Sequence, residues 1–189
     1  MLKLNYWTDK WDLHEDICPC DVHFNDWVAK EKLKNKNIYH FGSGTHHVVG
    51  IKQAERKNRT LCITASKEEY NAYVDLVTEN SGVAKNYVCY FGDIYLTNPL
   101  LLPDFDAVTM FHLCEFFFPN TASKEYGGLT DAKLLDLFTA KTKKGGHILF
   151  YTRSMGWEKS KAIIAKWEKK QKVKRVGEFK TLLVYRKTG

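Results

Sequence analysis

Short apolar runs rich in β-branched and aromatic residues recur along the chain, and helix-length stretches separate most of them. Runs of this kind are typical of buried strands, and strands that alternate with helices indicate a parallel sheet. The predicted strands cover residues 37–41, 60–64, 87–91, 106–111 and 147–151. The pattern therefore predicts an α/β fold with helices on both faces of a mostly parallel sheet.

Apolar positions also mark the intervening helices. The predicted helices cover residues 48–57, 68–79, 131–140 and 160–169. The third is the clearest, because leucine and phenylalanine residues cluster at helical spacing at positions 134, 135, 137 and 138. Gly145 and Gly146 are expected to end this helix and to release the fifth strand.

Two further strand-like segments, residues 172–176 and 181–185, follow the last predicted helix. The link between them contains Gly177 and is short. A parallel return needs a crossover of about a dozen residues, so these two strands must pair in antiparallel fashion. The sheet should therefore have seven strands and end in an antiparallel pair.

The first 36 residues precede the first strand and are rich in aromatic side chains. We expect them to pack across the carboxyl edge of the sheet, or along one flank, as a cap. With 189 residues, of which 44% are hydrophobic, the chain is long enough for one domain with a sizeable core. We therefore expect a single domain over residues 1–189, with a cap over residues 1–36 and a core over residues 37–189.

The first predicted strand runs directly into a glycine-rich turn, because residues 38–47 read IYHFGSGTHH. Glycines at such a turn let the backbone bend sharply and approach a ligand closely, as in nucleotide-cofactor sites. A dinucleotide loop would have a further glycine at position 47, and an acid about 20 residues after its first glycine. Position 47 is His47, and residues 62–66 contain no acid, so NAD is a weaker alternative.

Four motifs in order make residues 35–187 resemble the class I S-adenosylmethionine-dependent methyltransferases. Residues 41–45, FGSGT, are similar to the centre of the family's first glycine loop. Gly92 and Asp93 follow the third strand, where the family contacts adenine. The remaining two motifs are residues 105–116, FDAVTMFHLCEF, and residues 144–150, KGGHILF. The resemblance implies a Rossmann-like fold, S-adenosylmethionine as cofactor and methyl transfer as the reaction.

The resemblance also implies which residues hold the cofactor. Residues 42–45 would cradle its methionine part, residues 64–66 would reach the ribose, and Asp93 with Ile94 would hold adenine. The implied cofactor-binding residues are Phe41, Gly42, Ser43, Gly44, Thr45, Thr64, Ala65, Ser66, Gly92, Asp93, Ile94, Phe111 and His112.

The chain departs from the family pattern at three positions. His40 stands where an acid is usual, His46 replaces a glycine, and Thr64 replaces the acid that binds the ribose. A hydroxyl in place of a charge-assisted partner costs about 1–2 kcal/mol. Two functions follow as alternatives: methyl transfer to a small-molecule acceptor with weaker cofactor binding, or a catalytically silent domain that binds RNA or a protein partner through its basic C-terminal region.

His112 is the candidate catalytic residue, because it follows the fourth strand and could take a proton near pH 7 from the acceptor. Three consecutive phenylalanines begin the segment 116–128, which also holds Asn120, and they cannot all face the core. Residues 6–11, YWTDKW, resemble the opening of thiopurine methyltransferase-like members, in which aromatic residues close over the cofactor. The candidate acceptor-binding residues are Trp7, Trp11, Glu115, Phe117, Tyr126, Tyr151 and Arg153.

The net charge of +7 comes largely from the region 159–187. Such a surface favours anionic partners, but a charge run alone does not make nucleic acid the favoured one. The five cysteines suit reduced thiols better than a disulfide framework, and without a signal segment or membrane span we expect a cytoplasmic protein. The oligomeric state is not predicted.

Metal binding is not expected. His14, Cys18, Cys20 and His23 are zinc-type ligands, but structural zinc sites join two separated pairs, and these four lie in one short segment. His40, His46, His47 and His112 could also converge near the glycine loop, although core roles for histidine are commoner than metal binding.

Overall fold

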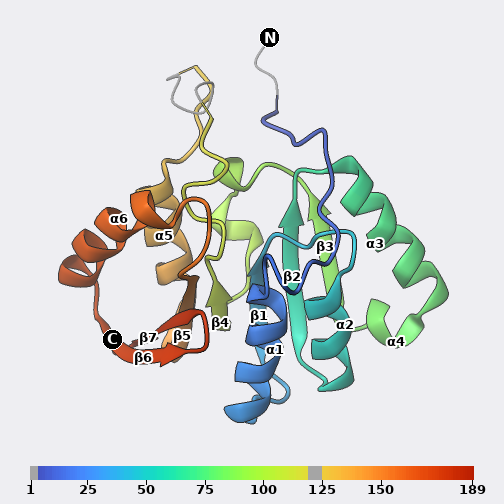
Figure 1. Ribbon diagram of the computed structural model, residues 1–189, viewed down its shortest axis with the longest axis horizontal. Coiled ribbons are helices and arrows are strands. Elements are labelled where there is room, and N and C mark those ends of the chain that lie inside the picture. Colours follow the sequence, from blue (N-terminus) through green and yellow to red (C-terminus); the bar gives the residue numbers. More distant parts are fainter. Residues whose placement is uncertain (1–3, 119–124) are drawn as a thin grey trace.

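The computed structural model describes residues 4–118 and 125–189, and in that part of the chain seven strands form one sheet (Figure 1). The strand order is β3-β2-β1-β4-β5-β7-β6. Strands β1 to β5 pair in parallel, whereas β7 is antiparallel to both β5 and β6. The strands are β1 (Asn37–Phe41), β2 (Arg59–Thr64), β3 (Tyr87–Phe91), β4 (Phe105–Thr109), β5 (Thr142–Tyr151), β6 (Val173–Phe179) and β7 (Leu182–Lys187). This is the mostly parallel seven-stranded sheet predicted from the sequence.

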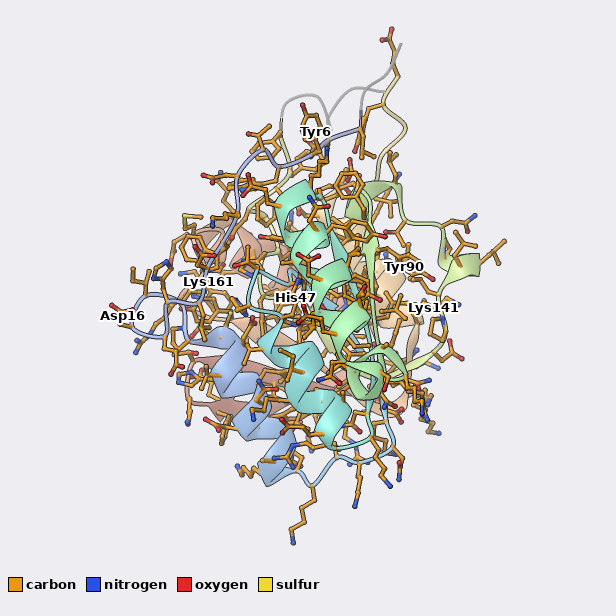
Figure 2. The ribbon with its side chains drawn as sticks, turned by 90° about the vertical axis from the view of Figure 1, so that its right-hand side faces the viewer. Tyr6, Asp16, His47, Tyr90, Lys141 and Lys161 are labelled. Atoms are coloured by element: carbon orange, nitrogen blue, oxygen red, sulfur yellow. The ribbon has the colours of Figure 1, made fainter. Side chains whose placement is uncertain are left out.

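Helices cover both faces of the sheet, as expected. One face carries α1 (Cys20–Lys30), α2 (Val48–Glu55), α3 (Lys67–Glu79) and the short α4 (Ser81–Ala84). The other face carries α5 (Asp131–Ala140) and α6 (Trp157–Lys170), with the 3-10 helices η1 (Ile94–Leu96) and η2 (Pro99–Leu101) in the connection between β3 and β4. Figure 2 shows α1, α2 and α3 from the side, with His47 near the start of α2.

Successive side chains of β1 pack into the two hydrophobic cores that lie on opposite faces of the sheet. Ile38 packs with α1 residues such as Phe24 and Val28, whereas Tyr39 points to the opposite face. There its ring stacks on Phe138 of α5 at a centroid distance of 3.9 Å. Because successive residues of a strand face opposite sides, a single apolar run can supply both layers.

The role predicted for Gly145 and Gly146 is wrong. The helix ends at Ala140, as predicted, but β5 already begins at Thr142, so Gly145 and Gly146 lie within the strand. The last carbonyl groups of the helix are bonded without a glycine cap: the Thr142 hydroxyl donates to the oxygen of Phe138 at 2.7 Å, and Nζ of Lys187 donates to the oxygen of Thr139 at 2.9 Å. Side-chain donors have replaced the glycine turn.

The sequence analysis also missed helix α1. Its buried residues, Cys20, Asp21, Phe24, Trp27 and Val28, share one helical face. The ring of Phe24 contacts Phe111 at a centroid distance of 6.0 Å and so fixes α1 against the sheet. This part of the predicted cap therefore packs on a flank.

The other part of the cap is an extended segment, residues 5–18, which we call the N-terminal strap. It crosses the carboxyl edge of the sheet, with Tyr6 at the top of Figure 2. Its backbone is held at two strand ends: the N–H of Trp7 donates to the oxygen of Ala65 at 3.0 Å, and the N–H of Thr45 donates to the oxygen of Trp11 at 2.8 Å.

None of the helices in the described ranges combines the length and apolar character needed to cross a membrane.

Candidate functional site

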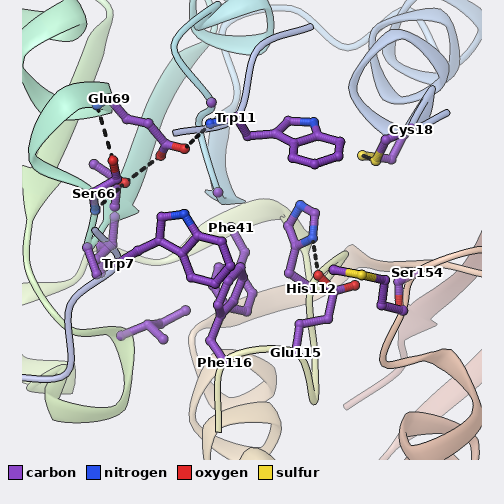
Figure 3. Close-up of a pocket in the computed structure, with 18 of the residues that line it drawn as sticks. Trp7, Trp11, Cys18, Phe41, Ser66, Glu69, His112, Glu115, Phe116 and Ser154 are labelled. Atoms are coloured by element: carbon purple, nitrogen blue, oxygen red, sulfur yellow. Dashed lines mark hydrogen bonds and ion pairs between the residues drawn. The ribbon is translucent and has the colours of Figure 1, made fainter. Parts of the chain in front are cut away.

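A pocket of about 260 Å³ lies at the carboxyl edge of the sheet, and the N-terminal strap covers it (Figure 3). We call this pocket the edge pocket. Its walls come from the turns after β1, β2, β3 and β4, from the segment after β5, and from the start of α1. Ligands of open α/β sheets bind at this edge, near the point where strand order reverses between β1 and β4. The fold therefore assembles distant segments into one cavity.

The glycine turn after β1 forms one wall of the edge pocket. Gly42 and Gly44 have φ angles of +85° and +56°, in the left-handed region that favours glycine. A Cβ on Gly44 would lie 2.8 Å from the backbone oxygen of Trp11, and one on Gly42 would lie 2.9 Å from the ring of His112. Both positions need glycine for conformation and for space.

Most of the residues proposed to bind the cofactor converge on the edge pocket. Its lining includes Phe41, Gly42, Gly44, Thr64, Ala65, Ser66, Gly92, Asp93, Ile94 and His112. Three of the proposed residues lie elsewhere. Ser43 is buried beside Cys89, the Thr45 hydroxyl bonds to Asp12 in the strap, and Phe111 packs in the core against Phe24.

The proposed acceptor residues divide in the same way. Trp7, Trp11, Glu115, Tyr151 and Arg153 line the edge pocket. Phe117 and Tyr126 do not: the Phe117 ring packs on Tyr95 at 5.5 Å, and Tyr126 is buried in the core.

The three consecutive phenylalanines separate as expected. The rings of Phe116 and Phe118 line the edge pocket beside Trp7, while Phe117 packs against the core. Asn120 lies outside the described residues.

A carboxylate missed by the sequence analysis lies beside Thr64. Glu69, in the first turn of α3, accepts a hydrogen bond from the Thr64 hydroxyl at 2.6 Å and one from the N–H of Trp11 at 3.2 Å. It lines the edge pocket, and burial raises its pKa. The acid sits five residues beyond the end of β2, where the helical turn brings it back to the strand end.

A second carboxylate comes from α1. Asp21 is 7% exposed and lies in the edge pocket wall, with Oδ1 3.3 Å from Nε2 of His40 and Oδ2 3.7 Å from Nε2 of His46. Although burial opposes ionisation, His40 and then His46 keep the pKa of Asp21 below its ordinary value. Asp21 thus supplies a carboxylate beside His40, the position where the family has an acid.

His112 faces the glycine turn and pairs with Glu115. Its Nδ1 lies 2.9 Å from Oε2 of Glu115. Burial opposes protonation, but the hydrogen bond and charge of Glu115 raise the pKa of His112 to about 9. The ring is therefore a cation at neutral pH and does not have the free electron pair that a general base needs. The expectation that His112 takes a proton near pH 7 is not supported.

This pair predicts a pH-dependent stability. The pKa of His112 rises from an ordinary 6.5 to about 9 on folding, so the protonated ring stabilises the folded state fully below pH 6.5 and loses that effect as pH approaches 9. We expect His112→Gln to lower the free energy of unfolding by about 2 kcal/mol on the acid side of this range. Urea titrations across the range should show the gap between wild type and variant closing with rising pH, and a gap that is constant or widens would contradict the assignment.

His47 and His23 form hydrogen bonds with other parts of the fold. His47 bonds to the Tyr87 hydroxyl and to the backbone oxygen of Glu69, both at 2.8 Å, and burial lowers its pKa to about 4. His23 bonds to Thr181, away from Cys18 and Cys20. Within the described residues, no group of three or more histidine, cysteine or acidic side chains is arranged to hold a metal ion.

Several solved structures similar to this chain are named methyltransferases, and one is named a decarboxylase. N-methyltransferase NodS from Bradyrhizobium japonicum WM9 is 13% identical, with a TM-score of 0.60 over 93% of this chain and 100% of NodS. The CcbJ methyltransferase from Streptomyces caelestis is 12% identical, with a TM-score of 0.53 over 74% of this chain and 51% of its own. The precorrin 8w decarboxylase from Methanobacterium thermoautotrophicum is 15% identical, with a TM-score of 0.59 over 100% of both chains. No protein-family model and no curated protein sequence matches the chain.

These likenesses confirm the fold implied by the four sequence motifs. The chain has the Rossmann-like architecture of class I methyltransferases. Because one of the neighbours is named a decarboxylase, the fold alone does not specify methyl transfer. The reaction must be argued from the edge pocket.

Proposed function

We propose that the protein transfers a methyl group from S-adenosylmethionine to a small-molecule acceptor. One observation carries the proposal: the glycine turn after β1, the residues after β2, Asp93 after β3 and His112 after β4 line one pocket. The ends of β1, β3 and β4 carry motifs that resemble those of the family, and the end of β2 is the place where the family binds the ribose. The neighbours named methyltransferases support the same reaction class.

The lining of the edge pocket fits this cofactor. Gly42 and Gly44 let the turn lie against His112 and the strap, because a Cβ on either residue would be too close to the His112 ring or the Trp11 oxygen. Carboxylates of Glu69, Asp93 and Asp21 offer acceptors for hydroxyl, amine and cationic groups, and the protonated His112 offers a donor for a carboxylate. Aromatic rings of Trp7, Phe41 and Phe116 supply apolar walls.

The chemistry supplied by bound S-adenosylmethionine is an electrophilic methyl group. The chain's own residues then have to align the acceptor, exclude water and hold charges in place. The N-terminal strap covers the edge pocket, and Trp7 packs edge-on against Phe116 at 5.1 Å. Glu115 occupies Nδ1 of His112, so Nε2–H remains for an anionic group of a ligand. This arrangement favours an acceptor that needs no strong base.

The charge and position of Arg153 bear on which molecules the edge pocket would bind as acceptor. It lies at the rim of the edge pocket after β5 and is exposed, so it can approach an anionic group on a molecule held between the aromatic walls. A pocket of about 260 Å³ beneath a strap suits a small molecule rather than a polymer. We therefore propose a flat, largely apolar acceptor.

All five cysteines are free thiols, which suits a reducing compartment, and we propose the cytoplasm.

The silent-domain alternative is not favoured. A domain that had lost its cofactor could have filled the edge pocket with side chains, yet the cavity and both glycines of the turn are present. The basic side chains near the C-terminus lie on α6, β6 and β7, and many are exposed. A charged surface of that kind needs no RNA partner to explain it.

Asp93→Ala should weaken S-adenosylhomocysteine binding about tenfold, because a charged acceptor contributes roughly 1–2 kcal/mol. Its Oδ1 accepts from the N–H of Tyr95 at 2.9 Å and its Oδ2 from the N–H of Asn5 at 3.1 Å. Asp75→Ala, on the exposed side of α3, is the matched control and should leave affinity unchanged. Equal affinity in wild type and Asp93→Ala would remove Asp93 from the site.

An acceptor screen tests the reaction itself. The protein is incubated with S-adenosylmethionine carrying a carbon-13 methyl group and with small aromatic hydroxyl, amine and thiol compounds. Release of S-adenosylhomocysteine together with a labelled product is the expected result. Transfer only to RNA, with every small molecule inert, would overturn the proposed acceptor class.

A further inference from the structure

Two cysteines flank the point where the N-terminal strap meets α1. Cys18 and Cys20 are separated by Pro19, and their Sγ atoms are 3.5 Å apart. Pro19 has φ −77° and ψ 9°, close to a helical turn. Residues two apart in such a turn have Cα atoms separated by about 5.5 Å, within the range that a disulfide spans. The backbone therefore already has the geometry that a bridge between these two cysteines requires.

The surroundings of Cys18 favour its thiolate. Cys20 is the first residue of α1, and the N-terminus of this helix, which carries a partial positive charge, has no side-chain cap. The hydrogen bond from Cys20, helped by the positive charge of His112, lowers the pKa of Cys18 to about 7. By contrast, burial beside Asp131 raises the pKa of Cys114 to about 12.

The two sulfur atoms also differ in access. Cys18 is partly exposed and lines the edge pocket, with its sulfur directed towards the space between Trp11 and His112 (Figure 3). Cys20 is 2% exposed and lies behind it, with its thiol 3.4 Å from Oδ1 of Asp21. An oxidant can therefore reach Cys18 first, and the sulfur of Cys20 is in place for the second step.

We propose that Cys18 and Cys20 form a redox-active dithiol that exchanges with small-molecule disulfides. The Cys18 thiolate attacks one sulfur of the disulfide, so a mixed disulfide forms and one thiolate leaves. Cys20 then attacks Sγ of Cys18 and its proton passes to the released thiolate, while the second half of the reagent departs as a thiolate that takes up from solvent the proton that Cys18 had released. The protein dithiol loses two electrons and two hydrogens, and the reagent disulfide gains them.

Oxidation changes the wall of the edge pocket. Bond formation shortens the distance between the sulfur atoms from 3.5 Å to about 2.05 Å and draws Cys18 towards α1. The neighbouring Ile17 carbonyl accepts from the Tyr151 hydroxyl at 3.4 Å, so this movement would also shift a contact between the strap and the edge pocket.

The test is treatment of the full chain with oxidised glutathione at neutral pH, followed by intact mass and peptide mapping. Wild type should lose two hydrogens at the peptide that contains Cys18 and Cys20, and reduced dithiothreitol should restore them. Cys114→Ala removes another half-buried thiol and should behave as wild type. Cys20→Ala should stop at a single glutathione adduct on Cys18.

A second measurement separates the role of Cys20 from any structural effect of its loss. The rate at which iodoacetamide alkylates Cys18 near neutral pH should fall several-fold in Cys20→Ala, because the hydrogen bond that stabilises the thiolate is gone, and should be unchanged in Cys114→Ala. A wild-type protein that remains as the glutathione adduct, that does not react, or that forms a bridge between other cysteines would overturn the proposal.

Discussion

Gly44→Val should weaken binding of S-adenosylhomocysteine by about 100-fold or more, which corresponds to about 2.7 kcal/mol. Gly44 has a φ of +56°, which a β-branched residue adopts only with strain. Its Cβ would lie 2.8 Å from the Trp11 oxygen, which already accepts the N–H of Thr45, and 2.4 Å from Nε2 of His46. The backbone of the turn and the strap cannot both stay where they are, so the cradle is lost.

Gly145→Val is the matched control for this variant. Gly145 also has a positive φ, +81°, but it lies near the start of β5, outside the lining of the edge pocket. Both variants should lose stability through backbone strain, while only Gly44→Val should lose affinity. Calorimetric titration, with circular dichroism to establish that each variant is folded, measures both effects. A folded Gly44→Val that binds as tightly as wild type would mean that the glycine turn does not form the cofactor site.

Asp21→Ala should lower the free energy of unfolding by about 3 kcal/mol or more, because the buried side chains that contact its carboxylate lose their polar partner, and each such loss costs roughly 1–3 kcal/mol. The carboxylate contacts His40 and His46, and it accepts from the Cys20 thiol at 3.4 Å. Without it these buried groups lose their partner, and each unsatisfied polar group is costly.

The control is Asp26→Ala on the same helix. Asp26 pairs with Lys180, but both side chains are about 45% exposed, and an exposed pair contributes less than about 1 kcal/mol. Urea unfolding of the two variants should therefore differ by about 2 kcal/mol or more. Equal losses in the two variants would contradict the assigned role of Asp21.

The sheet could be predicted from the sequence because its parallel strands are covered on both faces. Such strands appear as continuous apolar runs, and Asn37–Phe41 and Tyr87–Phe91 have the bounds that the pattern predicts. The start of β5 could not be predicted in this way. Thr142 and Lys187 donate hydrogen bonds to the carbonyl groups at the end of α5. Lys187 lies 45 or more positions further along the chain, so a local sequence pattern does not indicate its contact.

Helix α1 gave a signal that a helical-period analysis would have found. Cys20, Phe24, Trp27 and Val28 repeat at helical spacing, but the sequence analysis interpreted the aromatic residues of this segment only as part of a cap. The strap could not be predicted, since its path is fixed by backbone hydrogen bonds to Ala65 and Thr45.

The candidate site could be predicted only in part for the same reason. Gly42 and Asp93 follow a strand directly, so the position of the strand in the sheet places them at the edge pocket. Glu69 and Asp21 reach the edge pocket from the first turns of α3 and α1, and only the packed fold shows that they stand beside Thr64 and His40. The departures from the family pattern at Thr64 and His40 are thus accompanied by carboxylates from elsewhere in the chain.

Calorimetric titration of the purified protein with S-adenosylmethionine and S-adenosylhomocysteine, with NAD as the control ligand, tests the central claim most directly. We expect both sulfur-containing ligands to bind with dissociation constants on the order of micromolar, and NAD to give no binding. Absence of binding by both of them, or binding of NAD alone, would contradict the assignment of the edge pocket to S-adenosylmethionine.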